Sequence, residues 1–225
     1  MTFATQLKNE LLKYNLLNHP FYQMWNEGKI SVSTLQEYSK QYLFQVSALP
    51  TYISATHSIT EDTESRKILT ENLADEEING TDHVSLWKDF AFGLNVSKEE
   101  LSSAVKSKSI QNLIEVSKAF ASKSPASGFG VLYAQEHNYA NIATSKKEGL
   151  EKHFGMENNL TATKFFSVHE KADVWHAEQV EKLLNNLNAE EQKEALEAGV
   201  GVMKALNGFL DEMLALEGEY HCSAN

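Results

Sequence analysis

Apolar residues recur along this chain every three or four positions, the period of amphipathic helices, and they do so almost from end to end. The sequence has no alternating Val/Ile/Thr-rich segments, no internal repeat and no Gly-rich phosphate loop. Only three prolines interrupt the helical pattern. The pattern therefore predicts an all-α protein of seven or eight helices, packed as one domain over residues 1–225.

Capping signals and helix breakers set the expected helix boundaries. Capping-box patterns at Ser33 and Ser97 mark two helix starts. Pro50 is expected to kink the helix that begins near Ser33, and Asn79-Gly80 is expected to make an irregular turn within one long helix. The clearest break, Ser124–Gly128, is too short for a domain linker. The expected helical segments, short ones included, cover residues 3–16, 21–26, 33–59, 62–92, 97–106, 109–121, 128–153, 161–187 and 189–218.

One of these helices carries polar chemistry on its apolar side. His169, Asp173 and His176 lie at positions i, i+4 and i+7, so a helix places them within an arc of roughly 60° on one face. Phe165 lies on the same face, so two imidazoles and a carboxylate point toward the core. Buried polar groups need partners, and a metal ion would satisfy all three. The alternative is that each histidine is a hydrogen-bonded core residue.

Two further helices place possible metal ligands on apolar faces. Glu76 and His83 are seven residues apart on one stripe, and Glu136 falls between Leu132 and Ala140 on another. An unpaired buried carboxylate would cost several kcal/mol. Three carboxylates and three imidazoles suit iron or manganese, and six ligands fit a pair of ions about 3.5–4 Å apart better than a single ion. A set of buried Glu–His ion pairs is the competing interpretation.

Composition narrows the classes of function. The net charge of −11 leaves no basic stripe for nucleic acid. The single cysteine, Cys222, excludes a disulfide framework and an internal thiol nucleophile. The N-terminus lacks the pattern of a signal peptide, and no apolar run approaches the ~20 residues of a membrane span. We therefore expect a cytoplasmic protein that binds neither nucleic acid nor membrane.

The spacing Glu76-x6-His83, Glu136, His169-x3-Asp173-x2-His176 resembles that of the haem-oxygenase-like di-metal oxidases. Within that family it is most similar to the subgroup of the Chlamydia protein associating with death domains, over residues 19–180. The resemblance implies a seven-helix haem-oxygenase/TenA-like bundle that is usually a homodimer. It also implies two metal ions (Fe/Fe or Fe/Mn), O2 as co-substrate and an external reductant.

The subgroup makes 4-aminobenzoate, the folate precursor, from one of its own tyrosines, with a lysine as amino donor. By resemblance, Tyr22 would be the sacrificed side chain, Tyr38 its neighbour and Lys146 the amino donor. Some relatives carry a tyrosine just before the third ligand glutamate, where this chain has Gln135, whose amide cannot carry a radical. From the residues alone, both tyrosines are equally well core aromatics, and Lys146 equally well lies on a solvated face.

Other functions remain open at this point. A di-metal oxidase of this kind would also serve an external fatty or amino acid substrate, by oxidative decarboxylation, C–C cleavage or N-oxygenation. The name of the relative suggests binding to host death domains, although no separate binding module is visible. A thiaminase-type hydrolase would need an internal cysteine, and haem binding through His19 would leave the six-residue set unexplained.

Overall fold

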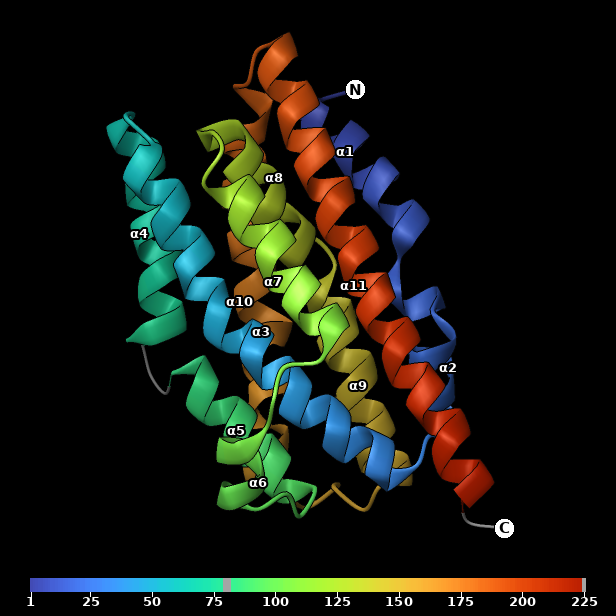
Figure 1. The fold of residues 1–225 in the computed structure, drawn as a ribbon. Coiled ribbons are helices and arrows are strands. Elements are labelled where there is room, and N and C mark those ends of the chain that lie inside the picture. The colour runs from blue at the N-terminus through green and yellow to red at the C-terminus, as the bar shows by residue number, and fades with distance from the viewer. Residues whose placement is uncertain (79–81, 224–225) are drawn as a thin grey trace.

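The computed structural model describes the chain except residues 79–81 and 224–225, and except the side chains of residues 171–174 and 219–223. Long helices run side by side in a bundle, with α4 at one edge and α11 along the opposite side (Figure 1). The described residues contain helices and no strand, which confirms the all-α prediction. None of these helices is both long and apolar enough to cross a membrane. The helices are α1 (Phe3–Leu11), α2 (Pro20–Asn26), α3 (Val32–Ile59), α4 (Thr63–Glu77), α5 (His83–Gly93), α6 (Lys98–Ser103), α7 (Lys108–Ala121), α8 (Pro125–Glu136), α9 (Tyr139–His153), α10 (Leu160–Asn185) and α11 (Ala189–Ser223), with 3-10 turns at Leu12–Tyr14 and Leu16–Asn18.

Two helices that were predicted to be continuous are each divided in two. The helix expected over 62–92 ends at Glu77, and α5 begins at His83, where the side chain of Asp82 accepts a hydrogen bond from the backbone of Ser85. Asn79-Gly80, where an irregular turn was expected, lies outside the described residues. Glu76 and His83 are therefore held by separate helices, which lets them approach from different directions.

The helix expected over 128–153 is also two helices, because α8 ends at Glu136 and α9 starts at Tyr139. Asn138 lies between them, and its side chain donates to Asn15 and accepts from Asn141. The backbone of Asn138 is not helical, with φ −132° and ψ 8°, so one helix ends before it and the next begins after it. The break gives α9 a direction of its own.

Most helices begin directly after a side chain that caps them, and α3 and α8 begin earlier than predicted. Ser31, not Ser33, caps α3 by accepting from the backbone of Thr34. α8 starts at Pro125, three residues earlier than predicted, because Ser124 is its N-cap and proline suits the first helical position. The capping box at Ser97 is confirmed, and α3 continues through Pro50.

The core is unusually aromatic on the side where α2, α3, α5, α9 and α10 meet. Helices α2 and α9 contact each other, α10 contacts α5 and α9, and α3 contacts α5. One lysine, Lys146, is among the largest fully buried side chains. The aromatic residues buried with it are Phe21, Trp25, Tyr38, Trp87, Phe90 and Phe166. Lysine is almost never fully buried unless its amine is paired, so the burial of Lys146 points to a specific role for this side chain.

Helices α8 and α11 pack with their backbones in close approach at Gly130. A Cβ atom at this position would overlap the backbone of Ala195, which cannot move away as a flexible side chain would. We expect Gly130→Ala to lower the free energy of unfolding by about 1 to 3 kcal/mol, as overpacking does. Thermal or denaturant unfolding measures this change.

Gly208 on α11 supplies the matched control. It is exposed, and a Cβ there would meet no heavy atom within 4 Å. Because alanine is the better helix former, Gly208→Ala should raise stability by up to about 1 kcal/mol. Equal effects of the two substitutions would contradict the close approach at Gly130.

Candidate metal centre

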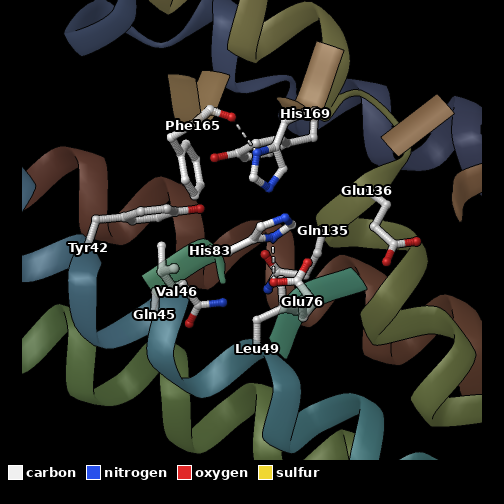
Figure 2. A pocket seen from close by; sticks show the side chains of 11 residues that line it. Tyr42, Gln45, Val46, Leu49, Glu76, His83, Gln135, Glu136, Phe165 and His169 are labelled. Atoms are coloured by element: carbon white, nitrogen blue, oxygen red, sulfur yellow. Dashed lines mark hydrogen bonds and ion pairs between the residues drawn. The ribbon is translucent and has the colours of Figure 1, made fainter. Parts of the chain in front are cut away.

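Three buried donors from three different helices face one another inside the bundle. Glu76 at the end of α4, His83 at the start of α5 and His169 on α10 each offer a ligand atom, and these atoms lie within 4.8 Å of one another. Figure 2 shows the three side chains turned toward a common space. Glu76 Oε2 lies 2.8 Å from His83 Nδ1. An imidazole–imidazole–carboxylate set of this kind is typical of sites for iron and similar metals.

The ring of His169 is oriented for metal binding. Its Nδ1 donates to the carbonyl oxygen of Phe165 at 2.7 Å, which leaves Nε2 as the ligand atom. Its ring centroid lies 4.3 Å from that of His83. Burial, with a further contribution from His83, lowers the pKa of His169 to about 3. The imidazole is therefore neutral at any physiological pH, as a metal ligand must be.

Glu136 extends the site to one side. Its Oε1 accepts from Asn72 Nδ2 at 2.6 Å, and its Oε2 is buried without a hydrogen-bond partner among the described residues. Burial raises the pKa of Glu136 to about 7, against the opposing effects of His176 and the Asn72 hydrogen bond. An unpaired buried carboxylate oxygen is costly, and a metal ion would remove that cost.

His176, on α10, is buried next to this carboxylate. Its Nε2 lies 2.8 Å from Asp75 Oδ2, and Asp75 directly precedes Glu76 on α4. The charge of His176 affects the pKa of both Glu136 and His169, so the three groups are neighbours. Asp173 lies on α10, but its side chain is outside the described residues. Glu76, His83 and His169 are thus one group of donors that could hold an ion, and Glu136 and His176 lie beside it.

A small cavity opens beside these donors. Its volume is about 30 Å³, enough for one or two molecules the size of water or dioxygen. Its wall opposite the histidines comes from α3, at positions i, i+3, i+4 and i+7 of one face. The four α3 residues are Tyr42, Gln45, Val46 and Leu49. Besides the donors, the cavity is also lined by Gln135, Tyr139 and Phe165.

Tyr22, Tyr38 and Lys146 form a second buried cluster. The hydroxyls of Tyr22 and Tyr38 are 3.0 Å apart, and Lys146 Nζ donates to the Tyr38 hydroxyl at 2.8 Å. Burial raises the pKa of both phenols well above the usual value. Burial also lowers the pKa of Lys146 from 10.5 to about 7. The Lys146 side chain is fully buried, contrary to the solvated-face alternative. Because of the lowered pKa, a large share of its amine is unprotonated near neutral pH.

The Lys146 amine lies among aromatic rings. It is 4.9 Å from the ring centroid of Tyr22, 5.3 Å from those of Tyr38 and Tyr42, and 5.5 Å from that of Tyr139. Tyr42 and Tyr139 also line the metal cavity, so they connect the two clusters. Sequence reasoning passed over Tyr42, Asn72 and Asp75. The available signals were that Tyr42 follows Tyr38 by one helical turn, and that Asn72 precedes Glu76 by one turn.

A family model described as iron-containing redox enzyme matches residues 36–208, the stretch that supplies every donor described above. This chain belongs to the iron-containing redox enzyme family. It is therefore an oxidoreductase, and nitrogen and oxygen donors without thiolate are appropriate for the iron of that family. The orphaned Glu136 oxygen and the neutral His169 fit a bound metal ion as well.

One named relative and two solved structures are similar to this chain, the two structures in fold alone. A protein of Chlamydia muridarum named 4-aminobenzoate synthase is 36% identical over 99% of this chain and 94% of its own length. A Shewanella denitrificans domain of unknown function with a heme oxygenase-like fold superposes with a TM-score of 0.78 at 16% identity, over 97% of this chain and 91% of that one. A TenA homologue from P. horikoshii gives 0.77 at 15% identity, over 95% and 98%. The haem-oxygenase/TenA-like fold expected from the sequence is confirmed.

Proposed function

We propose that this protein makes 4-aminobenzoate in an oxygen-dependent reaction, using its own Tyr22 as the source of the ring and Lys146 as the amino donor. The relative from Chlamydia muridarum carries the name of that activity. The observation that supports a self-derived substrate is the buried Tyr22–Tyr38–Lys146 cluster, which lies beside the metal cavity.

The chemistry of the product matches a tyrosine side chain. In tyrosine, Cβ is attached to the ring para to the hydroxyl group, and in 4-aminobenzoate the carboxylate is para to the amino group. Formation of the product therefore needs oxidation of Cβ, cleavage of the Cα–Cβ bond and replacement of the ring oxygen by nitrogen. The Lys146 amine lies 4.9 Å from the centre of the Tyr22 ring, close to the atoms that the last step would change.

The residues of the chain would divide the work between the two clusters. Glu76, His83 and His169 would hold one ion, and Glu136, Asp173 and His176 would complete the second position. Iron in this site, as an Fe/Fe or Fe/Mn pair, supplies the electrons that reduce O2, and an external reductant restores them. The aromatic cage around Lys146 keeps water from the ring and leaves much of the amine unprotonated near pH 7. A homodimer, as in the family, is part of this proposal.

An external substrate is the competing possibility, and the cavity does not favour it. A volume of about 30 Å³ admits dioxygen but not a fatty acid or an amino acid. The same protein acting on such a substrate would have to open the bundle first.

Intact mass spectrometry tests the proposal. The protein is loaded with iron and reductant and exposed to air, and we expect product to appear together with a mass loss that maps to position 22. Tyr22→Phe should lose product by at least about 100-fold, because phenylalanine lacks the ring oxygen that directs the oxidation. Tyr14→Phe is the control, because the Tyr14 ring lies near Lys204 and does not line the metal cavity. Product from Tyr22→Phe at the wild-type level would refute the self-derived substrate and favour an external one.

A further inference from the structure

Tyr42 is the side chain that joins the metal cavity to the buried tyrosine–lysine cluster. It is buried, with 7% of its surface exposed, and it lies on α3 one turn after Tyr38. Figure 2 shows its ring reaching into the cavity with the hydroxyl directed toward His83 and His169. On its other side the ring stacks on that of Tyr38, with centroids 5.5 Å apart and an interplanar angle of 13°.

We infer that Tyr42 carries oxidising equivalents from the metal cavity to Tyr38 and Tyr22, as a transient phenoxyl radical. This inference rests on the proposed function, which requires that Tyr22 be oxidised from the metal cavity. It names the residue through which that oxidation passes. Gln135, which lines the same cavity, has no redox chemistry, so the amide at this position cannot perform that step.

The electron and proton balance of each step is simple. Glu76, His83 and His169 would hold the iron at which dioxygen, the oxidant, is reduced, and Tyr42 would give up one electron and its phenolic proton to that reduction. The Tyr42 radical then takes an electron from the stacked Tyr38 ring, the phenolic proton of Tyr38 passes to the Lys146 amine, and the resulting ammonium returns a proton to Tyr42. Tyr38 takes both an electron and a proton from Tyr22 across the 3.0 Å hydrogen bond between their hydroxyls. Each passage oxidises Tyr22 by one electron and reduces oxygen by one.

Lys146 is placed to assist the middle step. Its Nζ is 2.8 Å from the Tyr38 hydroxyl, so an unprotonated amine there can hold the phenolic proton while Tyr38 is oxidised. Loss of an electron from a phenol that keeps its proton is much harder, and a base at hydrogen-bond distance removes that obstacle. The buried aromatic surroundings also keep water and external reductants away from the radicals.

Two other side chains bridge the same space, and the contacts favour Tyr42 over both. Tyr139 lines the cavity and its ring centroid lies 5.2 Å from that of His169, but it is only half-buried, whereas Tyr42 is buried and stacks on Tyr38. Trp87 contacts both Tyr38 and Tyr42 but does not line the cavity. Its Nε1 also donates to the Ser39 carbonyl at 2.7 Å, which holds its proton in place.

Tyr42→Phe is the decisive variant, because it keeps the stacked ring and removes the hydroxyl. We expect iron content and melting temperature to match the wild type and O2 to be consumed. Product should fall at least tenfold, and mass spectrometry should find Tyr22 intact. Freeze-quenched samples should lack the tyrosyl radical signal that wild type shows by electron paramagnetic resonance. Tyr133→Phe, a buried tyrosine whose hydroxyl donates to Glu181 away from the cavity, should retain both signal and product.

A second measurement does not depend on loss of activity. 3-Aminotyrosine placed at position 42 is oxidised more easily than tyrosine and should trap the radical there, with a distinct resonance spectrum. Absence of that radical, or retention of product by Tyr42→Phe with its loss in Tyr139→Phe, would overturn the assignment. If wild type itself makes no 4-aminobenzoate, the proposed function fails. If wild type makes it and Tyr42→Phe does so equally well, only the inference about Tyr42 fails.

Discussion

Lys146→Met is expected to make the protein more stable and to abolish 4-aminobenzoate formation. Burial lowers the pKa of Lys146 from 10.5 to about 7, so placing its charge in the core costs about 3 to 5 kcal/mol at pH 7. Methionine has a similar shape and no charge, but it leaves the Tyr38 hydroxyl without its lysine donor, a loss of about 1 kcal/mol. The net gain in the free energy of unfolding should be about 2 to 4 kcal/mol at pH 7, measured by denaturant titration of the metal-free protein.

The gain in the free energy of unfolding that Lys146→Met brings should decrease as the pH rises. Between about pH 7 and pH 10.5 the unfolded chain keeps the lysine proton that the folded chain has released. The stability of the wild type therefore rises with pH relative to the variant across this window, until only the loss of about 1 kcal/mol from the missing Tyr38 hydrogen bond separates them. Below pH 7 both states hold the proton and the difference is at its maximum.

Lys147→Met is the matched control. Lys147 is the next residue on α9, and its side chain is partly exposed and lies 3.5 Å from Glu170. Removal of a partly exposed ion pair should change stability by no more than about 1 kcal/mol, at every pH. A Lys146→Met protein that is less stable than wild type at pH 7 would show that the amine is better accommodated than its burial indicates. Such a result would also weaken its role as an unprotonated amino donor.

The sequence predicted the helical class and the faces that carry the donors, because helical periodicity is a local property. It placed His169 and His176 on the apolar side of α10, and both are buried. It could not predict the division of residues 62–92 and 128–153 into pairs of helices. Those breaks depend on side chains such as Asn138, whose hydrogen-bond partner Asn15 is far away in the chain.

The burial of Lys146 could not be derived from local pattern either. Lys147 and Glu148 follow it, and such a run is typical of a solvated helix face. The family resemblance, not the periodicity, singled it out. The aromatic cage around it comes from α2, α3, α5 and α10, elements far apart in sequence. The connection through Tyr42 was missed for the same reason, since the sequence does not reveal which face of α3 meets the donors of α4, α5 and α10.

His169→Ala is expected to have the largest effect on metal binding. His169 supplies one of three ligand atoms that lie within 4.8 Å of one another, and its Nδ1 hydrogen bond to Phe165 fixes the ring in place. Loss of a ligand should weaken binding at that position by more than the 10- to 100-fold typical of removing a ligand's supporting hydrogen bond. Metal analysis should then find about one ion fewer per chain, with no 4-aminobenzoate formed.

Two further variants make this result specific. His169→Gln keeps most of the side-chain volume and a carbonyl oxygen, so it should fold as the wild type does and bind iron weakly. His57→Ala removes a partly exposed histidine that lies near Arg66 and does not line the cavity, and should leave iron content unchanged. Full iron content in both His169 variants would mean that the buried Glu76, His83 and His169 form a structural ion-pair cluster. The oxidant would then have to arise elsewhere, and Tyr42 would have no source from which to draw its radical.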